Sequence, residues 1–317
     1  MSGHSISRIR VLKVLLLAEE AAGLRVLRSL TSRNLEIAAV VTTPAEAGSL
    51  SSIEDVARRA GCPVWRPMQT CQNELGDRIR NSGVDVLLNV HSLHILDASV
   101  INAPKIGSFN LHPGPLPEMA GLNAPSWAVY LGNRQHAVTL HWMKAGIDTG
   151  AIVFSKQFAL DENETGLTVS NTCVKLGVPL IESLLDMAAE NPDSIPARPQ
   201  NTGERRVFRR DELPNNGRIE WSNSAREITA FVRAADYGPF PSPWGHPKTR
   251  LGKLNLEILK ASATDEVTDV TAGTVLTLRD EAVAVASGDR VVLLQKVQLD
   301  GKPANACEFI KQGDVLR

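Results

Sequence analysis

The sequence has no long hydrophobic run and no excess of charge of either sign. No stretch approaches the roughly 18 uninterrupted apolar residues that a membrane-spanning helix needs. The polar start, MSGHSISRIR, lacks the apolar segment and cleavage pattern of a signal peptide. Lysine and arginine number 34 and aspartate and glutamate 35, which gives a formal net charge of −1. The chain therefore has no basic excess for non-specific nucleic-acid binding and no acidic excess for a basic partner.

Cysteine is scarce, and its positions follow no zinc or disulfide pattern. The four cysteines form no Cys-x-x-Cys pair and show no spacing typical of a zinc site. Because no export signal is present either, they are interpreted as free thiols in a reducing compartment. We therefore expect a cytoplasmic protein with no membrane partner.

The order of strand and helix patterns predicts two domains, which also suits a chain of 317 residues. Over residues 1–195, short apolar runs suited to buried strands alternate with helical patterns. This alternation predicts an α/β fold with a mostly parallel, Rossmann-like sheet and helices on both faces. Strands are expected at 11–18, 35–41, 62–65, 84–90, 106–111, 137–143 and 151–159. Helices are expected at 19–33, 52–60, 123–131 and 166–190.

The pattern changes after a proline-rich stretch. Residues 196–205 are expected to form a linker, because the surrounding segment has few apolar residues. Residues 206–317 then contain one helical pattern, near 223–234, followed by short strands with turn signals between them. Closely spaced short strands are typical of a small β-barrel or sandwich, so the second domain is expected to be rich in β-structure.

A phosphate-binding glycine loop is missing after the first strand. Residues 18–24 read AEEAAGL, where a dinucleotide-binding fold needs Gly-x-Gly-x-x-Gly. This absence argues against a Rossmann oxidoreductase. Glu19 and Glu20 stand there instead. They either favour a cationic substrate or form a solvated first helical turn, where acids suit the helix dipole.

Three polar residues lie where predicted strands end. Asn110 and His112 are two residues apart on one strand, so their side chains point to the same side. Open α/β sheets bind ligands at the carboxyl ends of such strands. Asp148 follows another strand, 36 residues after His112, in the tight loop GIDTG. The three residues are expected to share one cavity; the alternative is a structural histidine and an ordinary turn.

These residue types suit acyl transfer to an amine, and no metal is needed. The amide of Asn110 can donate an N–H to the carbonyl oxygen and stabilise an oxyanion. His112, with an ordinary pKa of about 6.5, can take a proton from an attacking nitrogen near neutral pH. Asp148 can orient the imidazole, or relay protons through water, and favour the imidazolium form.

Several segments carry a family resemblance: FNLHPGPLP, AGLNAPSWA and MKAGIDTGAIV. They resemble the formyltransferase family, whose hallmark is Asn-x-His with an Asp in a Gly-x-Asp-x-Gly loop, 36 residues after the His as here. Residues 209–245 are similar to the segment that opens the C-terminal domain of methionyl-tRNA formyltransferases, a small open, OB-like β-barrel. The resemblance implies an enzyme that transfers the formyl group of 10-formyltetrahydrofolate to an amine, with Asn110, His112 and Asp148 as catalytic residues.

The resemblance also implies a folate site made from two segments. One matches the family's apolar pterin-binding segment and the other the loop that closes over the pterin. The residues concerned are Leu93, His94, Ile95 and Leu96 in the first and Ala145, Gly146 and Ile147 in the second. The family's contacts here are largely made by the main chain, so they do not dictate the type of His94. Without the resemblance, HSLHIL is a strand end that contains two histidines.

The kind of amine is suggested by departures from the methionyl-tRNA pattern. Residues 41–52 contain no lysine or arginine where that pattern has a basic loop, and Glu118-Met119 stands in place of its Arg-Gly. A protein that binds tRNA needs cations to neutralise phosphates. We therefore expect an amine on a small-molecule or carrier-protein-bound amino acid, for example hydroxyornithine.

Alternatives to this acceptor remain open. An arginine cluster within 205–210 keeps tRNA as a less favoured partner, followed by nucleotide amino sugars and by a folate-binding protein without turnover. On the acceptor side, the resemblance points to Met119, Asn123 and Trp127. The other interpretation of Trp127 is that it belongs to the core.

Overall fold

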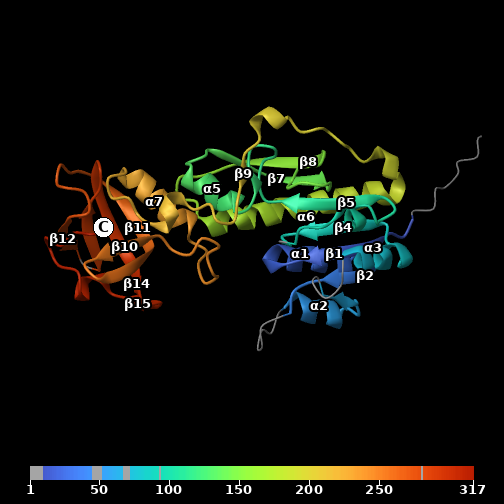
Figure 1. Ribbon diagram of the computed structural model, residues 1–317, viewed down its shortest axis with the longest axis horizontal. Helices are drawn as coiled ribbons and strands as arrows, with labels where there is room; N and C mark the ends of the chain where they lie inside the picture. Colours follow the sequence, from blue (N-terminus) through green and yellow to red (C-terminus); the bar gives the residue numbers. More distant parts are fainter. Residues whose placement is uncertain (1–9, 45–51, 67–71, 93, 280) are drawn as a thin grey trace, which may run out of the picture. The chain divides into compact units, whose positions relative to one another are not determined.

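The structure is a computed structural model that describes residues 10–44, 52–66, 72–92, 94–279 and 281–317 (Figure 1). Contacts within the chain divide it into two compact units. The first unit comprises Met1–Gly121, Ala137–Phe158 and Thr172–Val207, and the second comprises Leu122–His136, Ala159–Asn171 and Phe208–Arg317. Each unit is therefore assembled from several separate stretches of the sequence.

The first unit is built on a sheet whose described strands run in the order β3-β2-β1-β4-β5-β7-β8 (Figure 1). The strands are β1 (Lys13–Ala18), β2 (Glu36–Val41), β3 (Val64–Trp65), β4 (Val86–Val90), β5 (Gly107–His112), β7 (Gln135–Trp142) and β8 (Ile152–Ala159). All pairs from β3 to β5 are parallel, and β7 runs antiparallel to β5. The mostly parallel sheet predicted from the sequence is confirmed.

The composition of the strands explains their burial. β1 reads KVLLLA and buries every residue after Lys13, and β4 reads VLLNV and is buried throughout. Near-continuous apolar runs of this kind suit parallel strands that are covered on both faces. In β4 one polar residue, Asn89, interrupts the apolar run.

The order of the strands reverses between β1 and β4. The chain first adds β2 and β3 on one side of β1, and then crosses to add β4 and β5 on the other. A reversal of this kind leaves a crevice at the carboxyl ends of the strands, where open α/β sheets bind ligands. The end of β5, with Asn110 and His112, lies one strand away from this point.

Helices cover the two faces of this sheet. They are α1 (Glu20–Thr31), α2 (Ile53–Arg59), α3 (Gln72–Asn81), α4 (Ala98–Ile101) and α6 (Gly166–Glu190), whose first turns belong to the second unit. Val100 of α4 shares a core with Leu15 of β1. α6 approaches the sheet so closely that a Cβ on Gly177 would lie 2.7 Å from Cδ2 of Leu111. Among the described helices, none is long and apolar enough to cross a membrane.

The second unit is built on an antiparallel sheet in the order β10-β11-β14-β13-β12, with β15 paired to β14. The strands are β10 (Lys248–Leu251), β11 (Leu254–Val267), β12 (Val275–Arg279), β13 (Ala282–Ala286), β14 (Arg290–Leu299) and β15 (Lys302–Ala304). α7 (Ala225–Ala234) opens with a capping box between Ser224 and Glu227. Its apolar residues Ile228 and Val232 share a core with Leu256 of β11. The predicted C-terminal β domain is confirmed.

The remaining elements are short. α5 (Ala124–Tyr130) lies in the second unit and packs against α7. β6 (Ala120–Gly121) pairs with β9 (Val207–Phe208) as a separate two-stranded ladder. β6 matters for the site, because it follows directly on the proline-rich loop that leaves β5.

Candidate active site

Asn110, His112 and Asp148 lie together at the carboxyl edge of the first unit's sheet. Asn110 and His112 point from β5 to the same side, and Asp148 comes from the loop between β7 and β8. The amide Nδ2 of Asn110 donates to Oδ1 of Asp148 over 3.2 Å, and Nδ1 of His112 lies 3.5 Å from Oδ2 of Asp148. The structure thus brings together all three residues that the sequence singles out.

Asp148 is largely buried, with a side chain that is 12% exposed. The backbone N–H of Gly121, in β6, donates to Oδ2 over 2.8 Å. Burial by itself would raise the pKa of Asp148. The nearby imidazoles of His112 and His141, together with the Gly121 N–H, instead hold that pKa well below its usual range. Asp148 is therefore a carboxylate at neutral pH.

His112 is buried, with 3% of its side chain exposed. Its Nε2 lies 2.7 Å from the carbonyl oxygen of Met119, which can only accept a hydrogen bond. Nε2 therefore carries a hydrogen, and the neutral imidazole keeps its lone pair on Nδ1, on the side of Asp148. Burial lowers the pKa of His112, while the charge of Asp148 opposes this shift. At neutral pH the imidazole of His112 is therefore uncharged, and the carboxylate of Asp148 lies beside its basic nitrogen, Nδ1.

A second histidine, His141, completes the site, and the sequence analysis did not identify it. It lies on β7 directly opposite Asn110 in the antiparallel pairing and is 2% exposed. Its Nδ1 donates to the carbonyl of Trp142 over 2.7 Å. Its Nε2 lies 3.1 Å from Nδ2 of Asn110 and 3.4 Å from Oδ1 of Asp148. The signal was a histidine inside the apolar run AVTLHWM, on the strand that precedes the Asp148 loop.

The loop of Asp148 is held in place from the segment that was expected to be a linker. Nε2 of Gln200 donates to the carbonyls of Asp148 and Gly150, over 2.8 and 2.6 Å. The guanidinium of Arg205 donates to the carbonyl of Ile147. Asp148 has a φ of 48° and Gly146 a φ of 100°, so the loop adopts a left-handed conformation that these contacts stabilise. Nothing in the sequence pattern of 196–205 indicated this role.

The expected folate segments lie on two loops, and Leu93 falls outside the described residues. His94 and Leu96 are partly buried, whereas the side chain of Ile95 is 77% exposed. Both ends of the Gln72 amide hold this loop: Nε2 donates to the carbonyl of Ile95 over 3.0 Å and Oε1 accepts from the N–H of Asp97 over 2.6 Å.

In the second loop, Ala145, Gly146 and Ile147 are exposed, and the side chain of Ile147 is 48% exposed. The hydroxyl of Thr149 donates to the carbonyl of Ala145 over 3.0 Å. In both loops an apolar side chain is exposed to solvent, and side-chain hydrogen bonds from Gln72 or Thr149 hold the main chain.

The three expected acceptor-side residues have different surroundings. The side chain of Met119 is 4% exposed, and its main-chain carbonyl is the group that contacts His112. Asn123 and Trp127 belong to the second unit. Asn123 precedes α5 with a φ of 60°. Trp127 is 4% exposed and stacks on Phe208, with ring centroids 4.6 Å apart.

Glu19 and Glu20, at the end of β1, differ in their contacts. The carboxylate of Glu19 accepts hydrogen bonds from the backbone and side chain of Thr43, over 2.8 and 3.0 Å. Glu20 is 69% exposed, and its Oε2 lies 3.1 Å from Nδ1 of His91, at the end of β4. This hydrogen bond lowers the pKa of Glu20. Of the two acids, Glu20 therefore presents its charge to solvent, at the point where the strand order reverses.

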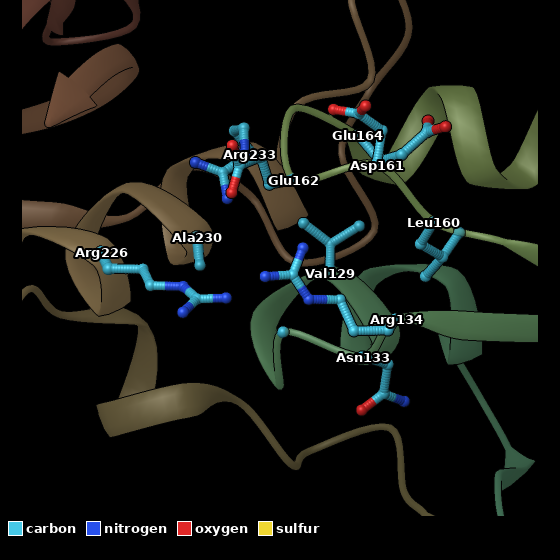
Figure 2. A pocket seen from close by; sticks show the side chains of 11 residues that line it. Val129, Asn133, Arg134, Leu160, Asp161, Glu162, Glu164, Arg226, Ala230 and Arg233 are labelled. Atoms are coloured by element: carbon cyan, nitrogen blue, oxygen red, sulfur yellow. The ribbon is translucent and has the colours of Figure 1, made fainter.

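A separate small hollow lies within the second unit (Figure 2). Its volume of about 30 Å³ is enough for a water molecule but not for a folate or an amino acid. Its charged lining residues are Arg134, Arg226, Arg233, Asp161, Glu162 and Glu164. Arginines and acids are equal in number, so the hollow is a balanced ionic surface.

Comparison with known proteins identifies the family of this chain. The model of the formyl transferase family matches residues 12–183, and the model of the formyl transferase C-terminal domain matches residues 213–313. The chain belongs to the formyltransferase family. It is an enzyme of tetrahydrofolate-dependent one-carbon transfer, and its substrates include an amine.

Curated relatives match over most of their length. A methionyl-tRNA formyltransferase of Clostridioides difficile (strain 630) is 27% identical over 284 residues, which cover 87% of this chain and 88% of that protein. One of Rickettsia bellii (strain RML369-C) is 26% identical over 307 residues, covering 95% and 96%.

Solved structures show the same fold. The N-formyltransferase from Helicobacter canadensis, in complex with folinic acid and dTDP-3-aminofucose, has a TM-score of 0.66 at 18% identity and covers 90% of this chain and 99% of its own. WlaRD, a sugar 3N-formyl transferase solved in the presence of dTDP and 5-N-formyl-THF, has a TM-score of 0.68 at 17% identity, with coverages of 92% and 99%.

Proposed function

We propose that this enzyme transfers the formyl group of 10-formyltetrahydrofolate to the amine of a small or carrier-bound amino acid. The observation that carries the proposal is the convergence of Asn110, His112 and Asp148 at one sheet edge. Asp148 lies 3.2 Å from Nδ2 of Asn110 and 3.5 Å from Nδ1 of His112. This arrangement offers an N–H donor, an uncharged base and a carboxylate in one place. Acyl transfer to an amine needs these three functions.

His112 acts as the base through Nδ1. Its Nε2 is committed to the carbonyl of Met119, so Nδ1 takes the proton from the attacking amine nitrogen. The imidazolium that forms is stabilised by Asp148, 3.5 Å from Nδ1. The proton is then returned to the nitrogen that leaves the formyl carbon, while a new carbon–nitrogen bond joins the formyl group to the amine. No proton is gained or lost overall.

Asn110 stabilises the charge that develops on the formyl oxygen. Nδ2 carries two hydrogens, which face Asp148 and His141 over 3.2 and 3.1 Å. One of them turns to the formyl oxygen when the donor is bound. A side-chain amide in this role typically contributes about 10²- to 10³-fold in rate.

The two loops beside this trio suit the pterin of the donor. Ile95 and Ile147 present exposed apolar side chains that can pack against the faces of a flat heterocycle. Main-chain groups of the same loops can supply polar contacts to a flat heterocycle.

The acceptor class is inferred from charge. Glu20 offers an exposed carboxylate at the switch point, and residues 41–52 contain no lysine or arginine. A carboxylate there favours an acceptor with a second cationic group, such as ornithine or hydroxyornithine, and disfavours a phosphate-bearing one.

A methionyl-tRNA substrate is the second candidate. It is favoured by the curated relatives, which are methionyl-tRNA formyltransferases matched over 87% and 95% of this chain. Against it stands the contact of Arg205, a member of the basic cluster, with the carbonyl of Ile147, which commits this arginine to the Asp148 loop.

The direct test is an acceptor panel with 10-formyltetrahydrofolate as donor. Tetrahydrofolate release and a mass gain of one formyl group are measured for hydroxyornithine, ornithine, charged initiator tRNA and a nucleotide amino sugar. We expect turnover with the amino acids and none with the His112→Ala variant. If no amine is formylated while the donor still binds, the proposal fails; efficient formylation of tRNA overturns the acceptor class.

A charge-neutral variant tests the role of Glu20. Glu20→Gln keeps a hydrogen-bonding group near His91 but removes the charge, so KM for ornithine should rise about tenfold while KM for the folate donor is unchanged. Glu190→Gln, at the exposed end of α6, is the matched control. An unchanged KM for ornithine would remove Glu20 from acceptor recognition.

A further inference from the structure

Asn89 is a polar residue within β4, a buried strand whose other residues are apolar. It lies in β4 between Leu88 and Val90 and is 6% exposed. Its neighbours in register are Leu17 of β1 and Asn110 of β5. A buried amide is costly unless it is hydrogen-bonded, so its partners indicate why it is present.

The donor side of the Asn89 amide is directed to the active site. Nδ2 donates to Oδ1 of Asn110 over 2.9 Å, and the carbonyl of Ser92 lies 3.5 Å from the same nitrogen. The acceptor side differs: among the residues that the structure describes, Oδ1 of Asn89 is buried and has no hydrogen-bond partner. An unpaired buried carbonyl destabilises a fold by about 1–3 kcal/mol. Asn89 therefore does not serve stability alone.

The hydrogen bond from Asn89 determines which way the Asn110 amide faces. With Oδ1 of Asn110 accepting from Asn89, Nδ2 is directed to Asp148 and to Nε2 of His141. The reverse orientation would set the Asn110 oxygen against the carboxylate oxygen of Asp148. It would also set two amide NH₂ groups against each other at Asn89.

The same hydrogen bond changes the strength of the Asn110 donor. A donor placed on an amide oxygen polarises the amide, and its N–H groups then form stronger hydrogen bonds. The effect is larger in a buried site, where the local dielectric constant is low. Asn89 contacts Oδ1 of Asn110, the atom of the amide opposite the Nδ2 donor that faces Asp148.

We propose that Asn89 is a positioning residue for formyl transfer. It orients and polarises the Asn110 amide, whose Nδ2–H stabilises the charge on the formyl oxygen. This inference rests on the role given to Asn110 under the proposed function. It predicts a residue that helps turnover without helping the fold.

The test is a double-mutant cycle between Asn89 and Asn110. Asn89→Leu, Asn110→Ala and the double variant are compared with the native chain for kcat, KM, thermal midpoint and binding of folinic acid. Turnover is followed as tetrahydrofolate release with the acceptor from the panel that reacts fastest. Asn89→Leu should lower kcat about tenfold, with folinic acid binding and the thermal midpoint unchanged or the midpoint raised. In the Asn110→Ala background the same substitution should change kcat less than about twofold.

A neighbouring buried polar residue supplies the contrast. Ser108 of β5 is 2% exposed and donates to the carbonyl of Ile101 over 2.7 Å, away from the trio. Ser108→Ala should lower the thermal midpoint and leave kcat unchanged, the reverse of the pattern for Asn89→Leu.

The outcomes separate the two proposals. If Asn110→Ala keeps the native rate, the role of Asn110 is wrong and the proposed mechanism fails with it. If Asn110→Ala is slow but Asn89→Leu is as fast as the native chain, only the inference about Asn89 is overturned. It is also overturned if Asn89→Leu costs the same in both backgrounds, or if its loss of rate comes with a lower midpoint and weaker folinic acid binding.

Discussion

Asp148→Asn is the substitution that tests the site most directly. The change keeps the size of the side chain and removes the charge that faces Nδ1 of His112, 3.5 Å away. An asparagine can also still accept a hydrogen bond from Gly121, so the loop keeps one of its contacts. What is lost is the stabilisation of the imidazolium during proton transfer.

The size of the effect follows from Coulomb's law. Two unit charges about 4 Å apart attract by about 4 kcal/mol at an effective dielectric constant of about 20. If the proton is half transferred in the transition state, about 2 kcal/mol is lost, and complete transfer loses all of it. At about 1.4 kcal/mol per factor of ten, the expected decrease in kcat lies between about 30- and 1000-fold. We expect about 100-fold or more.

The assay is tetrahydrofolate release at saturating donor and acceptor, with folinic acid binding measured in parallel. Asp193→Asn is the control, since Asp193 is exposed and lies outside the site. Binding should be kept in Asp148→Asn and both rate and binding in Asp193→Asn. A native-like kcat for Asp148→Asn would refute the electrostatic reasoning and the assignment of Asp148 together.

Two further predictions concern pH and the Asp148 loop. Burial lowers the pKa of His112 in the folded chain, so the unfolded chain takes up this proton first as the pH falls. The stability associated with neutral His112 is therefore present above about pH 6.5 and is lost as the pH falls towards the lowered pKa. The urea midpoints measured at pH 7.5 and pH 5 should therefore differ less in His112→Gln than in the native chain. An equal difference in the two proteins would contradict the lowered pKa of His112. Gln200→Leu removes the two hydrogen bonds to the carbonyls of Asp148 and Gly150, and should lower kcat/KM for the folate donor about tenfold. Gln157→Leu, exposed on β8, should not, and equal rates in the two variants would show that the loop needs no support from Gln200.

The parts of the fold that follow local rules were predictable. Runs such as KVLLLA are apolar over the length of a strand. From such runs and the turn residues beside them, the ends of β1, β4 and β5 were predicted to within two residues. Asn110 and His112 were recognised because a two-residue spacing on a strand places both side chains on one side. Asp148 was singled out by its place in the tight loop GIDTG after a predicted strand, and the family pattern then implied its catalytic role.

The supporting residues could not be predicted in this way. His141 faces Asn110 only because β7 turns back antiparallel on β5, a pairing that local periodicity does not specify. Gln200 contacts a loop 50 residues earlier in the chain, from a segment whose composition is that of a linker. Asn89 lies beside Asn110 only because of the register in which β4 pairs with β5, which the local sequence does not specify. In each case the information lies in a tertiary contact between segments distant in sequence.

The contacts of Gln200 and Arg205 affect how the catalytic part of this chain should be truncated for expression. A fragment that stops at residue 195 would contain Asn110, His112 and Asp148 and would resemble a whole catalytic domain in sequence. It would lack the two side chains that hold the carbonyls of Ile147, Asp148 and Gly150. The segment from Gln200 to Arg205 thus also holds the loop that carries Asp148. Any shortened version should extend at least to Val207, where the ladder with β6 begins.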